Sequence, residues 1–281
     1  MSFIHLRCHT SFSLLEGALS SSKLAKLAMN AGMPALGVCD TDNLFGVLES
    51  CEKFLAQGLQ PIVGCSLKIK FDDDVTGEVG FIVRSEQGYL NLLSFMSDAY
   101  LDGDAIHGPV VPIEQLRGQT DGLFLLSGNH EGVAHQLRAK RQLERLDSYL
   151  LRLSELAPSS FFVELQRVDR SGEGEVEKAL LDVAYKYDLP LVATNDVFYD
   201  VPEAHDAHDA LRCIARGEYV EDGSRDRLAP CHYFRSADEM ATLFSDLPEA
   251  IENSGLIAAS CGFFPKEHPP ILPRFVKGGV D

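Results

Sequence analysis

The sequence predicts an α/β fold in which seven strands curl into a distorted β/α barrel, followed by a helical extension. Short apolar runs alternate with amphipathic segments at the spacing of β-α units, which is typical of a parallel sheet covered on both faces. Polar residues gather just after these runs, as they do at the carboxyl ends of barrel strands. Strand-like runs disappear after residue 200. We therefore expect a barrel over residues 1–200, a helical extension of the same domain over 201–262, and a linker over 263–281.

The first predicted strand, residues 3–9, alternates with a period of two. This alternation places three nitrogen-bearing side chains on one face, those of His5, Arg7 and His9. The other six predicted strands are short apolar runs at residues 35–39, 61–71, 80–83, 122–127, 161–165 and 189–194.

Helices are predicted where apolar residues recur with a period of 3.6. The first follows a serine cap at 20–22 and stops at Gly32. The second follows Asp42, carries Leu48 and Leu55 on its apolar stripe, and ends at Gly58. The remaining predicted helices cover residues 87–100, 136–156, 176–187, 203–215, 236–245 and 247–260.

Composition excludes several classes of protein. The chain has 281 residues, 45% of them hydrophobic, without an apolar run long enough to span a bilayer. The N-terminus lacks the basic and apolar layout of a signal peptide, so we expect a cytoplasmic protein without a membrane partner. Its seven cysteines show no Cys-x-x-Cys spacing. This pattern argues against a disulfide framework and against a structural zinc ribbon.

The charge balance argues against direct binding of nucleic acid over a broad surface. The chain carries 25 basic and 42 acidic residues, a formal charge of −17. Such a field repels phosphate backbones unless a local basic patch opposes it. The densest basic run, residues 138–145, lies on a predicted helix, where we interpret it as a solvated face.

Polar residues after the predicted strands raise the possibility of a metal site. His9, Asp40 and Asp196 could form a metal triad, with Glu16 nearby, and a metal-bound water could then attack a phosphate ester. The alternative is structural, because an aspartate before a helix is commonly a cap and a histidine at a strand end commonly bonds backbone groups. Arg7 argues against a metal, since a guanidinium stays protonated and repels a divalent cation.

Several segments resemble, in the same order, the motifs of the polymerase and histidinol phosphatase (PHP) domain family. These are residues 5–18, 34–46, 61–64, 126–128 and 193–196, and the similarity continues through 206–209 and 233–240 to Cys261. The closest resemblance is to the branch of this family at the N-terminus of bacterial DNA polymerase III alpha subunits. It implies DNA replication in a bacterial cytoplasm, a parent DNA-directed DNA polymerase (a nucleotidyltransferase), and a palm, absent here, that would use Mg²⁺.

The resemblance also implies a metal-ligand pattern, and this sequence departs from it. His9 and Asp196 match ligand positions, Glu16 stands at an aspartate position, and Asp40 begins an Asp-His pair. The remaining ligand positions carry Arg7, Thr41, Ser66, Asn129, Val168 and Phe198. Because valine and phenylalanine cannot coordinate a cation, we expect no bound metal and no catalytic residues in this segment. We further predict that Arg7 occupies the former metal position and neutralises Asp40 or Asp196.

Two functional hypotheses follow from the resemblance. In the first, the chain is a PHP domain with a degenerate metal site that supports the polymerase and docks a separate proofreading exonuclease subunit, with DNA contacted through the full-length protein. In the second, it is a phosphoesterase or 3′–5′ exonuclease that uses Zn²⁺ or Mn²⁺ with an atypical ligand set. Metal analysis with a hydrolysis assay discriminates between them. Whether the parent is replicative or an error-prone paralogue stays open.

Overall fold

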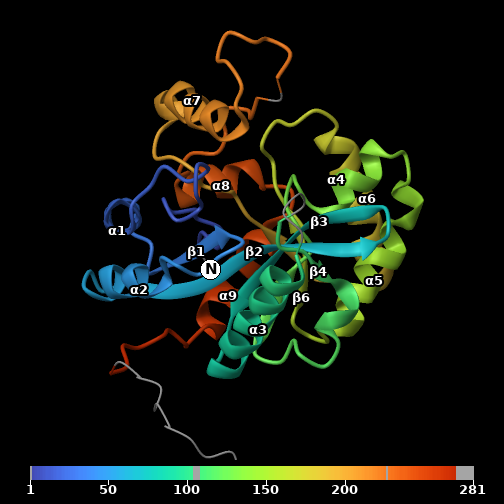
Figure 1. The fold of residues 1–281 in the computed structure, drawn as a ribbon, viewed down its shortest axis with the longest axis horizontal. Helices are drawn as coiled ribbons and strands as arrows, with labels where there is room; N and C mark the ends of the chain where they lie inside the picture. The colour runs from blue at the N-terminus through green and yellow to red at the C-terminus, as the bar shows by residue number, and fades with distance from the viewer. Residues whose placement is uncertain (1, 104–107, 226, 270–281) are drawn as a thin grey trace, which may run out of the picture.

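A curled mixed β-sheet lies at the centre of the computed structural model, which describes residues 2–103, 108–225 and 227–269 (Figure 1). The strands are β1 (Ala35–Thr41), β2 (Gln60–Asp72), β3 (Val75–Val83), β4 (Val111–Pro112), β5 (Leu123–Leu126), β6 (Phe161–Leu165) and β7 (Leu191–Ala193). Their order is β1-β2-β3-β5-β6-β7, and β4 pairs with β2. The predicted α/β class with a seven-stranded curled sheet is confirmed.

The prediction of an all-parallel sheet is wrong at β3. This strand runs antiparallel to both β2 and β5, whereas β1 with β2, β5 with β6, and β6 with β7 are parallel. Residues 72–79 have the composition of a loop, but β3 begins at Val75, directly after a tight turn at Asp73 and Asp74. A two-residue connection permits only antiparallel pairing.

The N-terminal segment is extended but does not form the regular strand predicted over 3–9. Gly37 N–H donates to the His5 carbonyl at 2.8 Å and Cys39 N–H donates to the Cys8 carbonyl at 2.9 Å. The chain advances three residues from His5 to Cys8 while β1 advances two, from Gly37 to Cys39. One extra residue on one strand is the signature of a β-bulge. On its other side, Val197 N–H donates to the Arg7 carbonyl at 3.0 Å. The segment thus bridges the gap between β1 and the chain that follows β7.

The helices are α1 (Ser21–Asn30), α2 (Val47–Leu55), α3 (Glu86–Asp102), α4 (Val133–Ala139), α5 (Leu146–Leu156), α6 (Glu173–Tyr187), α7 (His205–Arg216), α8 (Ala237–Leu243) and α9 (Pro248–Ser260), with 3₁₀ turns η1 (Ile113–Leu116), η2 (Leu143–Arg145) and η3 (Pro202–Ala204). The single helix predicted over 136–156 is wrong, because the chain breaks at Arg141, whose φ is +59°. Neither glycine nor proline marks this break. It leaves Lys140 and Arg145 in ion pairs with Asp74.

Helix α2 also differs from its prediction. It begins at Val47 rather than after Asp42, because Asp42 adopts a left-handed conformation and Asn43 bonds the Phe12 and Thr41 carbonyls. The stripe predicted to face the core contains two residues that are exposed, Leu48 and Leu55.

Alternate strand residues face the inside of the curled sheet and form a small core distinct from the larger core on its outer side. The inner core includes Ile62 of β2, Ile82 of β3, Phe162 of β6 and Val192 of β7. Helix α9 closes this apolar end with Ile257 and packs against β7 and β1 (Figure 1).

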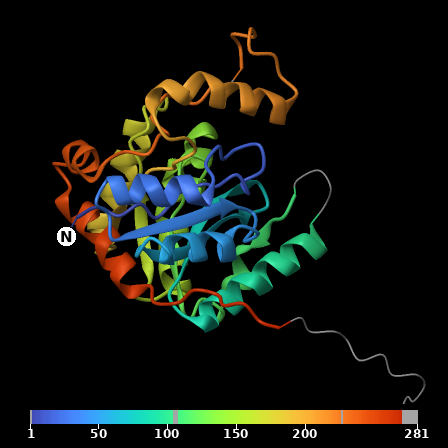
Figure 2. The same cartoon turned by 90° about the vertical axis from the view of Figure 1, so that its left-hand side faces the viewer.

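The segment after residue 200 contains the predicted helices, and its parts contact the barrel differently. Helix α9 completes the inner core, whereas α7 lies at the other end of the molecule, where His208 bonds the Glu16 carbonyl and stacks on Phe198 (Figure 2). Among the described residues, no helix is long and apolar enough to cross a membrane. The described part of the predicted linker is residues 263–269, and its remainder lies outside the described residues.

Candidate functional site

The inner face of the curled sheet changes from apolar to polar along β2, β3 and β6. Two residues beyond Ile82 and Phe162 in the period-two pattern come Gly80 and Glu164, and Glu78 follows Gly80. On β2 the same pattern leads from Ile62 to Ser66. The end opposite α9 therefore collects polar side chains from several strands. β3 runs in the opposite direction to β2 and β5. The polar residues near its start therefore lie beside the polar residues further along the neighbouring strands.

Arg7 lies in the middle of this polar end, completely buried. Its Nε donates to Asp196 Oδ1 at 2.7 Å and its Nη2 donates to Ser66 Oγ at 2.8 Å. Two further carboxylates lie within ion-pair distance, those of Glu164 at 3.5 Å and Glu78 at 3.6 Å. One guanidinium thus joins β2, β3, β6 and the segment after β7. Of the two partners predicted for Arg7, the structure has Asp196.

Gly80 provides the space for the Arg7 side chain. A Cβ atom placed on Gly80 would lie 2.5 Å from Arg7 Nη1, closer than nonbonded atoms approach. The glycine is therefore needed for close approach rather than for an unusual backbone angle.

The electrostatics of the cluster depend on burial and on Arg7. Burial alone would raise the pKa of Asp196, but Arg7 and the neighbouring histidines His130 and His9 hold that pKa well below its ordinary value. Burial raises the pKa of Glu164 and of Glu78, against the attraction of Arg7. Burial disfavours charge on His130, yet the pKa of His130 is raised because Asp196 stabilises its protonated form. Arg7 and His130 thus both oppose the negative charge of the buried Asp196.

Ser13, His9 and Asp196 are hydrogen-bonded in series, in the order serine, histidine, aspartate that a catalytic triad has. Its Nε2 lies 3.3 Å from Asp196 Oδ1 and its Nδ1 lies 3.3 Å from Ser13 Oγ. However, Ser13 is completely buried and donates its hydroxyl proton to Asp40 Oδ1 at 2.7 Å. Asp196 is already engaged by Arg7. A serine that no substrate can reach is not a nucleophile, so the chain is a structural network.

The other predicted residues divide between this cluster and a neighbouring network. Asp40 caps the turn after the first segment, because it accepts from Thr10 N–H at 2.6 Å and from the Thr10 hydroxyl at 2.8 Å. Thr41 donates to Glu16 Oε2 at 2.7 Å. Neither Asp40 nor Glu16 has a described contact with Arg7.

Three predicted positions carry side chains with other roles. Asn129 Nδ2 donates to Asp196 Oδ2 at 2.9 Å and to Glu78 Oε2 at 3.0 Å. The ring of Phe198 stacks on His9 with centroids 4.4 Å apart. Val168 is buried, and its backbone N–H donates to the Glu173 carboxylate. His5 does not join Arg7 and His9 as predicted, because its ring contacts Phe3 and Phe234 instead.

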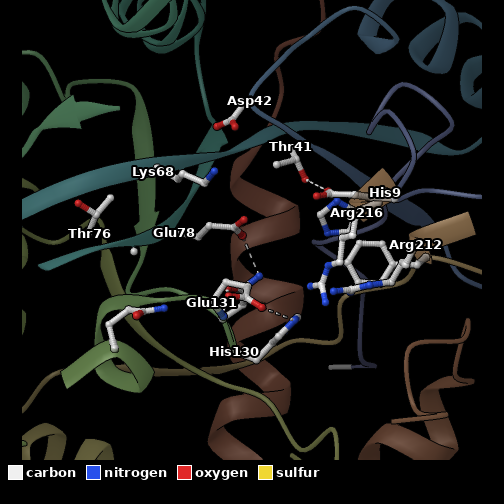
Figure 3. A pocket seen from close by; sticks show the side chains of 15 residues that line it. His9, Thr41, Asp42, Lys68, Thr76, Glu78, His130, Glu131, Arg212 and Arg216 are labelled. Atoms are coloured by element: carbon white, nitrogen blue, oxygen red, sulfur yellow. Dashed lines mark hydrogen bonds and ion pairs between the residues drawn. The ribbon is translucent and has the colours of Figure 1, made fainter. Parts of the chain in front are cut away.

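A pocket of about 290 Å³ opens over the cluster (Figure 3). Arg212 and Arg216 of α7 reach toward it from one side, and Lys68 lies on the other (Figure 3). Asp42, at its rim, has one carboxylate oxygen that is buried without a hydrogen-bond partner, and burial raises its pKa to about 7. The pocket therefore carries charges of both signs.

Four residues of the cluster are absent from the site predicted from the sequence: Glu78, Glu164, His130 and His232. Glu78 was hidden because its strand was predicted to begin at residue 80, although Val75, Val79 and Phe81 already alternate with it. His232 Nδ1 lies 3.1 Å from the Asp196 carbonyl oxygen, on a loop without any periodic signal. The alternation could have revealed Glu78, whereas nothing local reveals His232.

The residues present do not fit a metal cluster. The guanidinium of Arg7 lies between the carboxylates. Gly80 leaves room for it, because any larger side chain would clash with Arg7 Nη1. Among the described residues, no three or more His, Cys, Asp and Glu side chains are arranged to hold a metal ion. A fixed cation in the centre of the donor set repels a second cation there.

Comparison with known proteins gives consistent matches. The model of the PHP domain matches residues 5–168. DNA polymerase III subunit alpha of Caulobacter vibrioides (strain NA1000 / CB15N) is 40% identical over 283 residues, covering 98% of this chain and 25% of that protein. The corresponding protein of Rickettsia bellii (strain RML369-C) is 37% identical over 273 residues, covering 97% of this chain and 23% of that protein. The chain thus spans about a quarter of the length of these relatives.

Among solved structures, a Bifidobacterium adolescentis protein provisionally named a metal-dependent phosphoesterase superimposes with a TM-score of 0.47 and 17% identity, over 69% of this chain and 86% of that one.

Proposed function

Because this chain belongs to the PHP domain family, we propose that it is the N-terminal PHP domain of a bacterial DNA polymerase III alpha subunit and that it acts as a structural support. Residues 201–262 are then a helical extension of the same domain, and 263–281 lead toward the palm. The parent polypeptide is a DNA-directed DNA polymerase of the cytoplasm. The support for this proposal is the match of nearly the whole chain to such subunits.

The observation that carries the structural role is the position of Arg7. A cation held by carboxylates of β3, β6 and the segment after β7 substitutes for the bridging charge that a metal would supply. The barrel keeps its acidic residues without needing a metal to neutralise them. A domain built in this way is suited to hold a shape, and we derive no hydrolytic step for it.

The proposed partners follow from this role. The domain contacts the rest of the polymerase polypeptide and docks a proofreading exonuclease subunit, which supplies in trans the hydrolysis that this domain does not perform. DNA is bound by the full-length protein. The charge of −17 supports this division, because an acidic domain contributes little to binding a phosphate backbone.

Metal analysis and a hydrolysis assay test the proposal together. The purified chain is dialysed against Zn²⁺ or Mn²⁺, its metal content is measured, and its hydrolysis of a phosphate ester and of single-stranded DNA is followed. We expect no stoichiometric metal and no hydrolysis above that of His9→Ala. Tight stoichiometric metal with turnover that disappears in His9→Ala would instead establish the alternative, a phosphoesterase or 3′–5′ exonuclease with an atypical ligand set.

A further inference from the structure

Five large apolar side chains are exposed on α2, on α3 and on the residues just before α2. They are Phe45, Leu48, Leu90, Tyr100 and Leu101, which are 68%, 36%, 52%, 53% and 82% exposed. We call these five residues the α2–α3 face. Scattered exposed leucines are ordinary on protein surfaces, but a contiguous group of large apolar side chains marks an interaction site.

The two parts of the α2–α3 face are held side by side at both ends. At one end, Leu48 of α2 and Leu90 of α3 line the same hollow of about 690 Å³. At the other, the Tyr100 hydroxyl donates to the Asp42 carbonyl at 2.9 Å, close to Phe45 in the chain. The hollow between the helices is therefore a fixed feature of the surface.

The chain itself leaves the domain across this face. After α9 ends at Ser260, residues 262–268 border the same hollow. Phe263 packs its ring on Tyr89 of α3 with centroids 5.3 Å apart, and both Phe263 and Phe264 contact the main core. Whatever follows these residues in a longer polypeptide is tethered at the edge of the α2–α3 face.

We propose that the α2–α3 face is covered by the part of the polymerase polypeptide that follows this domain. The inference rests on the proposed function, in which the domain belongs to a polypeptide about four times as long. A tethered segment reaches the face at a high effective concentration, so it competes well against free partners. Glu86 and Lys266 both line the hollow, so its rim carries charges of both signs, and we expect the cover to bind mainly through apolar side chains.

Hydrogen exchange in the full-length polypeptide tests this inference. We compare peptides covering residues 45–55 and 86–102 between the full-length protein and the 281-residue chain. Exchange is expected to be about tenfold slower in the full-length protein. The double variant Leu90→Glu/Leu101→Glu removes this difference, whereas the matched control Ile214→Glu, at a residue 70% exposed on α7, keeps it. All variants of the 281-residue chain should unfold at the wild-type temperature, since these side chains lie on the surface.

Three other outcomes overturn the inference. Equal exchange in both proteins shows that the following polypeptide leaves the face open. Concentration-dependent dimers of the 281-residue chain that Leu90→Glu/Leu101→Glu abolishes identify a second copy as the occupant. Protection that appears only when the exonuclease subunit is added identifies that subunit instead. Nucleotide incorporation by the full-length protein is measured in parallel, because its absence would refute the proposed function, whereas incorporation with an open face refutes this inference alone.

Discussion

Two arginines in this molecule bind carboxylates in opposite environments. Arg7 is completely buried and holds Asp196, Glu164 and Glu78 inside the curled sheet. Arg145, on a surface turn, pairs with Asp72 and Asp74 at the β2–β3 connection. The ion pairs use the same chemical groups, but only the surface carboxylates can exchange their partner for water.

This difference determines what each arginine can do for the fold. Leaving Asp196 without Arg7 would strand a charge in the interior, where solvation cannot replace the lost partner. Asp72 and Asp74 are nearly half exposed, so water would take over if Arg145 left. Removing Arg7 should therefore lower the free energy of unfolding substantially, whereas removing Arg145 from its surface turn should change it little. The following predictions test this contrast.

Removal of the buried cation should have the largest effect. Arg7→Met keeps much of the side-chain volume but removes the guanidinium from Asp196, and breaking a buried ion pair costs about 3–5 kcal/mol. For a chain of this size we expect the melting temperature to fall by about 5–9 °C. Arg7→Lys, which keeps the charge but not the planar fork, should lie between wild type and Arg7→Met. A calorimetric shift below about 2 °C for Arg7→Met would show that the cluster is not structural.

The cost of Arg7→Met should itself depend on pH. In the wild type, Arg7 helps to hold the pKa of Asp196 well below its unfolded value of 3.8, so this stabilisation is present above that pH and disappears as the pH falls through the folded pKa. Without Arg7, the burial that favours a raised pKa of Asp196 is opposed only by His130 and His9, so the folded variant takes up a proton more readily than the wild type. The difference in unfolding free energy should therefore shrink from pH 8 to pH 5, by at most about 1.4 kcal/mol per pH unit for one carboxylate. Urea titrations at both values measure it, and a constant difference would contradict the assignment.

Filling the space beside Arg7 should cost less than removing it. The Cβ of Gly80→Ala would lie 2.5 Å from Arg7 Nη1, and overpacking of this kind costs about 1–3 kcal/mol. Gly174→Ala is the matched control, because no atom outside its own helix and its chain neighbours lies within 4 Å of the added methyl group. In a double-mutant cycle, Gly80→Ala should be milder in the Arg7→Met background, where the clashing nitrogen is absent. Strict additivity would show that the two residues do not interact.

Much of this contrast was visible in the sequence, and the rest has physical reasons for being hidden. Arg7 stands out because a guanidinium at a ligand position conflicts with a metal, and alternation placed it beside His9. Glu78 was missed because three aspartates before Val75 have the composition of a loop, although the connection is a tight turn. The exposure of Leu48 could not be predicted, since a helical period shows that residues share a stripe but not whether a neighbour covers it. Local sequence patterns thus predict the helices and strands, whereas the contacts between them depend on packing between residues far apart in the sequence.

Removal of the surface cation should have the smallest effect. Arg145→Gln keeps the side chain polar and leaves Asp72 and Asp74 to water, so we expect the melting temperature to change by about 2 °C or less. This small effect should fade further between 50 mM and 500 mM salt, because the Debye length shortens and exposed ion pairs weaken. The effect of Arg7→Met should persist over the same range, since ions do not reach the interior. If Arg145→Gln were as costly as Arg7→Met and equally insensitive to salt, the position of the β2–β3 turn, rather than burial, would be what gives an arginine its importance in this fold.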